Sequence, residues 1–355
     1  MASTRREALA ALLALSADAA TAVETPSGSL TDVPGVQVGH WTSSKRPTGC
    51  TAILTPGGAT AGVDVRGGGP GTRETDLLRP EASIQQVHGI CLAGGSAYGL
   101  AAADGVMRFL EEQGAGFAAG RWVVPIVPAA ILFDLNVGDG AVRPDAKAGY
   151  RAAKAATKGP VEQGNVGAGA GATVGKLFGA ERSMKGGLGS ASLRVGELVV
   201  GALAAVNAIG DVVDPKTGEI LAGALEPNHS GFADSAAYVR QGLRSAAEPA
   251  SPAAPNQNTT LGVVAANLNW TQAQATKCAQ MAHDGFARAI RPVHMPFDGD
   301  VVFALGTGGE ETDLRLLGVV GALAADALAL AVTAAVMHAR SIPGRPARRD
   351  LSFVQ

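Results

Sequence analysis

The chain has 355 residues, a net charge of −2 and a hydrophobic content of 46%. This length allows one large domain or two small ones. The near-neutral charge gives no electrostatic reason to expect binding to nucleic acid or to an acidic membrane surface. Aromatic residues make up only 4% of the chain, and Ala and Gly are abundant, so we expect a core of closely packed small side chains.

The cysteines argue against a disulfide framework or a metal site. Cys50, Cys91 and Cys278 are scattered, odd in number and match no motif spacing. We expect all three to be buried as small hydrophobic residues. The sequence contains no grouping of His and Cys residues with the spacing of metal ligands, so we expect neither a metal nor an organic cofactor.

Residues 1–27 are interpreted as an N-terminal extension, and residues 28–355 as a single domain. The extension has an arginine pair, a short apolar run and an A-x-A site, at Arg5-Arg6, Ala10–Leu15 and Ala20-Thr21-Ala22. This pattern is typical of a twin-Arg export signal. Glu7 and Asp18 instead favour an ordinary short helix. The location therefore stays open between periplasm and cytoplasm.

The first half of the domain combines short strands with glycine-rich turns. We predict strands at Thr51–Leu54, Ala61–Val65, Val87–Leu92 and Trp122–Leu132, a helix ending near Gln113 and another over Ala146–Thr157. The turn Ala93–Gly99 could cradle a phosphate between a strand and a helix. It lacks the G-x-G-x-x-G spacing, and close backbone packing explains its glycines more simply.

The second half has longer apolar segments. We predict strands at Leu198–Val206, Thr259–Ala266 and Val301–Leu305, a helix from Thr271 to Pro292 and a helix over Gly318–Val336. Thr271 and Gln274 form a capping box. The last helix approaches membrane-spanning length, but Asp326 and its many alanines favour burial between a sheet and other helices. The pattern predicts an α/β domain whose sheets are covered by helices.

The strand at Thr259 follows a turn-rich segment, Ala247–Pro255. If the Asn258–Thr259 bond is cut, Thr259 becomes a chain terminus with a hydroxyl and an α-amine on one residue. Such an amine has a pKa of about 7.7–8.0 and is a usable base at neutral pH. A terminal Thr of this kind is an established nucleophile. The alternative is that these residues simply begin a strand.

Four further polar residues are candidates for the same site. Lys176 is the only charge in a glycine-rich run, Asn207 ends an apolar strand, and Asp298 and Asp300 flank Gly299 just before another strand. The carboxylates at i and i+2 could hold and orient an amine. The alternatives are a solvated lysine, a turn asparagine and two turn aspartates.

Four stretches together resemble the self-cleaving L-aminopeptidase/D-esterase family, which includes β-peptidyl aminopeptidases and hydrolases of 6-aminohexanoate oligomers. These stretches are Thr31–Val36, Cys91–Leu100, Asn258–Thr260 and Phe297–Asp300, and the resemblance extends from about Leu30 to Met337. It implies an αββα sandwich like that of N-terminal-nucleophile hydrolases. It also implies a precursor that cuts itself between Asn258 and Thr259.

The resemblance also implies roles for single residues. Thr259 matches the nucleophile, and Asn207 matches an asparagine on the oxyanion side. Lys176, Asp298 and Asp300 match the branch that hydrolyses 6-aminohexanoate oligomers; the aminopeptidase branch is expected to have Ser and Glu in place of the two aspartates.

Two departures from the family pattern bear on specificity. Some branches have Tyr where this chain has Phe133, and the aminopeptidase branch has a Gly-Glu-Thr stretch where this chain has Pro128–Leu132. We expect Phe133 and Asp134 to contact the substrate, without the polar groups that read a free amine.

The sequence thus predicts an amide hydrolase with an acyl-enzyme intermediate. We expect a small peptide or oligoamide substrate, no membrane span, and a homo-oligomer of cleaved heterodimers. An acyltransferase of the ornithine acetyltransferase type, with the same self-cut Thr, is the first alternative. A non-catalytic or nucleotide-binding glycine-rich protein is the second.

Overall fold

The computed structural model describes residues 28–242 and 258–354. Its α-helices are α2 (Ala102–Glu112), α3 (Ala146–Lys154), α4 (Ser235–Arg240), α5 (Gln272–Ala289) and α6 (Leu314–Met337). Short 3₁₀ helices lie at Leu30–Asp32, Thr75–Leu78, Ser96–Ala101, Gly167–Gly169, Ala180–Arg182, Arg348–Asp350 and Ser352–Val354. The N-terminal extension and the turn-rich segment Ala247–Pro255 lie outside the described residues, which resume at Asn258.

The described strands form one large sheet and three small ones. In the large sheet the order is β10 (Gly187–Val195), β11 (Leu198–Asn207), β14 (Thr259–Asn269), β16 (Val301–Glu311), β2 (Gly49–Val65), β4 (Gln86–Ala93), β7 (Ala129–Ile131) and β3 (Thr72–Arg73), and β1 (Gln37–Thr42) also pairs with β2. The small sheets are β5 (Phe117–Ala119) with β6 (Trp122–Val124), β8 (Thr173–Val174) with β9 (Met184–Lys185), and β12 (Asp211–Val213) with β13 (Ile220–Ala222) and β15 (Ile290–Arg291).

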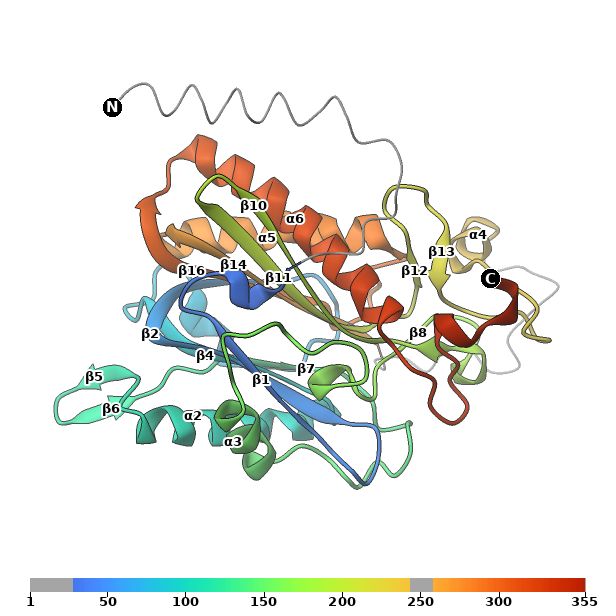
Figure 1. The fold of residues 1–355 in the computed structure, drawn as a ribbon, viewed down its shortest axis with the longest axis horizontal. Coiled ribbons are helices and arrows are strands. Elements are labelled where there is room, and N and C mark those ends of the chain that lie inside the picture. Colours follow the sequence, from blue (N-terminus) through green and yellow to red (C-terminus); the bar gives the residue numbers. More distant parts are fainter. Residues whose placement is uncertain (1–27, 243–257, 355) are drawn as a thin grey trace.

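The long strand β2 joins two layers of the large sheet. Its first part pairs with β1 and β4, and its last part pairs with β16. The register with β4 shifts between Leu54 and Ala59. Helices α5 and α6 cover one outer face, and α2 and α3 cover the opposite one (Figure 1). The result is the expected αββα arrangement.

The apolar side chains alternate between these layers, as the two-residue period of strands requires. On β14, Leu261, Val263 and Ala265 point into the space between the two sheet layers. Val264 and Ala266 point the other way, toward α5 and α6. A strand buried on both faces reads as an unbroken apolar run, which explains the sequence after Thr259.

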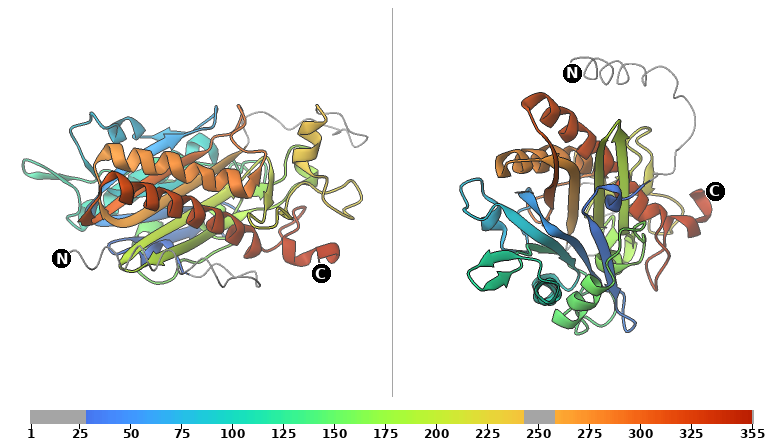
Figure 2. Two further views of the ribbon diagram at one scale, coloured as in Figure 1. Left: turned by 90° about the horizontal axis from the view of Figure 1, so that it is seen from above. Right: turned by 60° about the vertical axis from the view of Figure 1, so that its left-hand side comes forward.

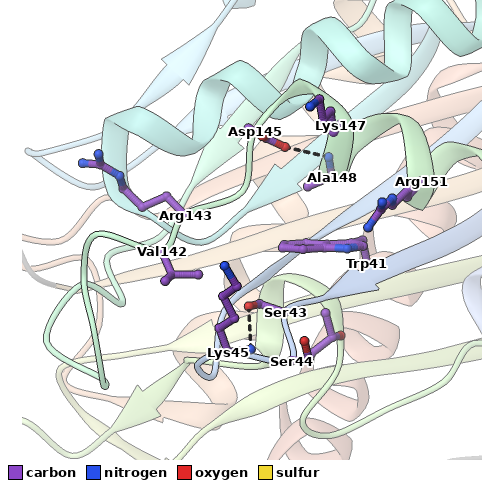
Figure 3. A pocket seen from close by; sticks show the side chains of 11 residues that line it. Trp41, Ser43, Ser44, Lys45, Val142, Arg143, Asp145, Lys147, Ala148 and Arg151 are labelled. Carbon is purple, nitrogen blue, oxygen red and sulfur yellow. Dashed lines mark hydrogen bonds between the residues drawn. The ribbon is translucent and has the colours of Figure 1, made fainter.

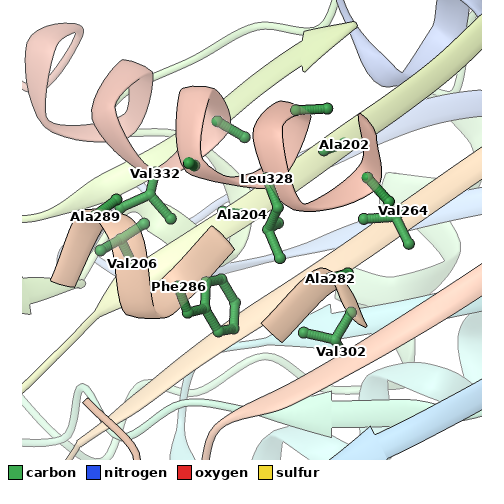
Figure 4. Close-up of a cluster of buried hydrophobic side chains, with 14 of the residues drawn as sticks. Ala202, Ala204, Val206, Val264, Ala282, Phe286, Ala289, Val302, Leu328 and Val332 are labelled. Carbon is green, nitrogen blue, oxygen red and sulfur yellow. The ribbon is translucent and has the colours of Figure 1, made fainter. Parts of the chain in front are cut away.

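The core under α5 and α6 is built mainly from small aliphatic side chains, as the composition predicts. Figure 4 shows Leu328 and Val332 of α6 and Phe286 of α5 packed over Ala204 and Val206 of β11. The two helices lie side by side over this layer (Figure 2). Small side chains allow this close contact, which fixes the strands that lead to the candidate site.

In the described part of the chain, α6 is the one helix long and apolar enough to cross a membrane. Most of it is buried against the sheet and α5, and its exposed Asp326 pairs with Arg288 of α5. Asp313 caps its first turn by accepting a hydrogen bond from the N–H of Leu316 over 2.8 Å. The prediction of a helix buried in the core is confirmed.

Two strand predictions are wrong. The segments Thr51–Leu54 and Ala61–Val65 belong to one strand, because β4 pairs with β2 both before and after an irregularity between Leu54 and Ala59. The predicted strand Trp122–Leu132 is instead β6 and β7. Pro125 and Pro128 lie between them, and a proline has no N–H for the hydrogen-bond ladder.

Candidate active site

Thr259 and Asn207 face each other across two paired strands. Thr259 is the first residue of β14, Asn207 is the last residue of β11, and the two are antiparallel register partners. Thr259 has the same strand parity as Leu261, and Asn207 the same as Leu203. Both side chains therefore point toward the space between the sheet layers. The register brings together two residues that are far apart in sequence.

The Asn258–Thr259 bond is buried and held from two sides. Asn258 is 2% exposed and Thr259 is 4% exposed. The Oγ1 of Thr259 donates to the carbonyl oxygen of Asn258 over 2.5 Å. The N–H of Gly299 donates to the same oxygen over 2.9 Å. The hydroxyl thus lies directly beside the bond at which the sequence predicts cutting.

Asp300 fixes the strand beside the nucleophile. Its Oδ1 accepts from the N–H of Thr260 over 2.6 Å. Its Oδ2 accepts from His294 Nδ1 over 2.8 Å and from the His294 N–H over 3.2 Å. Asp300 is 2% exposed, so these hydrogen bonds lie in the protein interior. In the intact chain, Asp300 therefore orients the neighbour of Thr259.

Asp298 lies close by but holds a different donor. Its Oδ2 accepts from the N–H of Met295 over 2.9 Å, and its buried Oδ1 has no hydrogen-bond partner in the residues that the structure describes. Burial, followed by the charge of Asp300, raises the pKa of Asp298 to about 7. In the intact chain the two carboxylates thus make separate contacts, and their expected role in holding the Thr259 amine after cutting stays a prediction.

Lys176 joins the site through Asn207. Its Nζ donates to the main-chain oxygen of Asn207 over 2.8 Å and to the side-chain Oδ1 over 3.0 Å. Burial lowers the pKa of Lys176 to about 7, although Asp298 and Asp300 raise it in part. Asn207 also accepts from the N–H of Thr173 and donates through Nδ2 to the carbonyl of Phe133 over 3.1 Å. Its amide is thus rigidly oriented.

His294 is a site residue that the sequence reasoning missed. It lies in the loop between β15 and β16, with a positive φ of 56°. It bonds Asp300 through both its main chain and its ring, and the ring packs edge-on against His283 with the centroids 4.8 Å apart. A single loop histidine gives no periodic signal. Its proximity in sequence to Asp300 was the one available hint.

The glycine-rich loop Arg66–Gly71 packs backbone to backbone against Asp298–Asp300. The N–H of Gly69 donates to Asp298 O over 2.7 Å, and the N–H of Arg66 donates to Asp300 O over 3.0 Å. A Cβ on Gly67 would lie 2.3 Å from Asp298 O. Glycine is required here because the two main chains touch.

Comparison with known proteins identifies the family. The family model described as "Peptidase family S58" matches residues 28–349. The chain belongs to peptidase family S58. It is therefore a hydrolase that acts on amide bonds and takes a peptide-like substrate, as the sequence predicts.

Relatives of this S58 peptidase carry names of two kinds. An "uncharacterized aminopeptidase" of Mycobacterium tuberculosis is 44% identical, with 91% of this chain and 97% of the relative covered. A "6-aminohexanoate-oligomer endohydrolase" of Kocuria sp. is 33% identical, with 80% of this chain and 75% of the relative covered.

Solved structures confirm the fold of the S58 peptidase. A β-aminopeptidase of Burkholderia sp. has a TM-score of 0.66 at 23% identity, covering 94% of this chain and 95% of that one. The L-aminopeptidase D-Ala-esterase/amidase of Ochrobactrum anthropi, described as a variant of the Ntn hydrolase fold, has a TM-score of 0.66 at 21% identity, covering 92% and 91%. The predicted fold is thereby confirmed.

The two predicted substrate contacts of the S58 peptidase differ in their surroundings. Phe133 is half-buried, and its carbonyl accepts from Asn207. Asp134 is 1% exposed, and its carboxylate accepts from Arg46, Thr48 and the N–H of Gly95. Since both carboxylate oxygens have internal donors, a direct contact of Asp134 with substrate stays a prediction.

No cysteine of the S58 peptidase competes with Thr259 as a nucleophile. Cys50, Cys91 and Cys278 are buried and free, as expected. Burial raises the pKa of Cys91 and of Cys278 to about 12, so these thiols stay protonated. Within residues 28–242 and 258–354, no group of three or more His, Cys, Asp or Glu side chains could hold a metal ion.

A basic pocket of about 480 Å³ lies beside α3 (Figure 3). Trp41 forms part of its wall, and its cations are Lys45, Arg143, Lys147 and Arg151. Its acid, Asp145, caps α3 by accepting from the N–H of Ala148 over 2.9 Å. The pocket shares no lining residue with the predicted site.

Proposed function

We propose that this S58 peptidase activates itself by cutting the Asn258–Thr259 bond and then hydrolyses amide bonds with Thr259 as an N-terminal nucleophile. The observation that carries the proposal is the position of the Thr259 hydroxyl, 2.5 Å from the carbonyl oxygen of Asn258. A hydroxyl buried this deeply can attack the bond beside it. It reaches an external substrate only after the chain has been cut and has rearranged.

The cut supplies a base on the nucleophilic residue itself. Once Thr259 is a terminus, its α-amine takes the Oγ1 proton as Oγ1 attacks a substrate carbonyl. The protonated amine then donates to the leaving amine, and water hydrolyses the acyl-enzyme. No residue besides Thr259 needs to form a covalent bond.

Lys176 and Asp298 assist by holding protons near neutrality. The pKa of each is shifted to about 7 by burial, which is the range in which acid–base groups work best. Lys176 also holds Asn207, whose amide would face the oxyanion side of the acyl group. Asp300 and His294 would keep the start of β14, and with it Thr259, in place.

The substrate would be a small peptide, β-peptide or ω-amino-acid oligomer. Support comes from the Asp298, Asp300 and Lys176 set and from the relatives called 6-aminohexanoate-oligomer endohydrolases. The half-buried Phe133 offers no phenol hydroxyl to a free substrate amine. We further propose that residues 28–355 form one domain and that the two cut chains stay together in a homo-oligomer.

The proposal is tested with a pair of variants at neighbouring positions. Thr259→Ala should remain uncut and inactive, because it has neither hydroxyl nor new amine. Thr260→Val is the matched control: the Oγ1 of Thr260 is buried without a partner among the described residues, and the substitution replaces that hydroxyl with a methyl group of similar size. It should be cut and active. Amide hydrolysis by uncut Thr259→Ala would disprove the proposed nucleophile.

A further inference from the structure

The main-chain N–H of Gly299 points at the carbonyl on which cutting must take place. It donates to the Asn258 oxygen over 2.9 Å, and Asn258 and Asp298 form a parallel bridge. When Thr259 attacks this carbonyl, negative charge develops on that same oxygen. We propose that the Gly299 N–H is the oxyanion donor for self-cleavage and, afterwards, for substrate hydrolysis.

This inference rests on the proposed function of Thr259. In the cutting step, a bond forms between Thr259 Oγ1 and the carbonyl carbon of Asn258, and the C–N bond to Thr259 breaks. The hydroxyl proton goes to the leaving nitrogen, which becomes the new α-amine. Water then hydrolyses the resulting ester, leaving a carboxylate on Asn258 and a free hydroxyl on Thr259. The charge on the carbonyl oxygen peaks in the tetrahedral intermediate of each step.

Position 299 has room for no side chain. A Cβ there would lie 2.5 Å from Thr259 Oγ1 and 2.9 Å from Gly69 O. Glycine is therefore the residue that lets a main-chain donor and the nucleophilic hydroxyl lie next to the same oxygen. A bulky residue would push one of the two away from the carbonyl.

The donor is held in place on both sides before the reaction begins. Asp298 O accepts from Gly69, and Asp300 O accepts from Arg66, so the glycine-rich loop clamps the residues flanking Gly299. On the other edge, the Asp300 carboxylate holds Thr260. A donor fixed in this way needs no reorganisation when charge develops, which is where such a group gains its effect.

The same geometry carries over to turnover. Substrate and precursor carbonyls are attacked by one oxygen, Thr259 Oγ1, so their acyl groups must occupy one place. When the new terminus at Asn258 leaves, the Gly299 N–H loses its acceptor and becomes available to the substrate carbonyl. The Asn207 amide, which already donates to Phe133 O, would act beside it rather than instead of it.

The test removes the N–H alone. Glycolic acid, the hydroxy-acid analogue of glycine, is placed at position 299 by cell-free translation, so that an ester replaces the amide. The ester also weakens the acceptor at Asp298 O. The matched control is therefore glycolic acid at position 69, which removes the donor to that acceptor (2.7 Å) and leaves Gly299 intact. Circular dichroism checks that both proteins fold.

The rate of cutting at 258–259 and the kcat of the protein once cut are the two measurements. With the 299 ester, we expect each to fall roughly 10²–10³-fold, the effect of one lost oxyanion donor. With the 69 ester, we expect a change of only a few-fold. Equal rates for the two esters, with wild type cut normally, would overturn the role of Gly299 while leaving Thr259 as nucleophile. An active but uncut wild type would overturn both.

Discussion

Asp300→Asn isolates the charge that positions the start of β14. The carboxylate accepts three hydrogen bonds, from the N–H of Thr260 and from the N–H and Nδ1 of His294. An asparagine can turn its oxygen toward Thr260 and donate through Nδ2 to the other tautomer of the His294 ring. The His294 N–H then faces a donor instead of an acceptor.

The cost of this change follows from those contacts. One buried N–H without a partner costs about 1–3 kcal/mol, and loss of the charge weakens the bond to Thr260 by roughly 1 kcal/mol. A total of about 2–4 kcal/mol leaves most domains folded. Turnover is more sensitive, because a shift of about 1 Å at a nucleophile can cost roughly 10²-fold. We therefore expect a folded protein whose kcat is lower by about 10²-fold or more.

The assay measures amine release from a 6-aminohexanoate oligomer with variant protein that has already been cut. Asp139→Asn is the matched control: Asp139 Oδ1 accepts from the N–H of Ala141 over 2.9 Å in an exposed turn. We expect that variant to keep its stability within about 0.5 kcal/mol and its activity unchanged. If cut Asp300→Asn turned over like Asp139→Asn, Asp300 would be a turn residue and the reasoning would fail.

Three further predictions concern neighbouring groups. Lys176→Met should lower kcat about 10²-fold or more, because it removes the cation that holds Asn207. Its control is Lys185→Met, which removes a buried lysine bound to three carbonyls elsewhere and should lower stability but leave the kcat of the folded enzyme intact. Equal losses of kcat in the two variants would contradict the role of Lys176. Because the pKa of Asp298 is raised to about 7, its favourable contribution to folding is fully present below about pH 4 and is lost as the pH rises through 7. In uncut Thr259→Ala protein, we therefore expect Asp298→Asn to raise Tm at pH 8 but not at pH 4. A gain in Tm that is independent of pH would refute this. Because Phe133 has no hydroxyl to bind a free amine, the rate of hydrolysis of N-terminally blocked oligoamides should be within about tenfold of the rate for unblocked ones. Complete inertness of the blocked compounds would show that another group binds the free amine.

Much of the site was predictable because it lies at strand ends. The apolar runs before Asn207 and after Thr259 define two buried strands, and the polar residue at each boundary marks the rim of the sheet. The capping box at Thr271 and the Ala-rich helix α6 were likewise local features of the sequence. Local patterns of this kind need no knowledge of distant contacts.

The contacts within the site were not predictable, because they join loops that are far apart in the chain. Gly69 and Asp298 touch although more than two hundred residues separate them. In the intact chain Asp300 accepts from Thr260 and His294, and Asp298 accepts from Met295. The spacing of the two aspartates gave no sign of these separate partners, and their joint contact with the Thr259 amine stays a prediction for the cut protein. The role of His294 depends on this loop conformation, and no periodicity encodes it.

The central claim is that the peptidase works as a self-cut protein with Thr259 at a new N-terminus. An intact-mass spectrum of purified, active wild-type protein tests it most directly, with Thr259→Ala as the uncut reference. We predict two chains from the wild type, one ending at Asn258 and one whose first residues are Thr-Thr-Leu-Gly, and a single chain from the variant. A wild-type spectrum with one uncut chain, from protein that hydrolyses amides, would contradict the account.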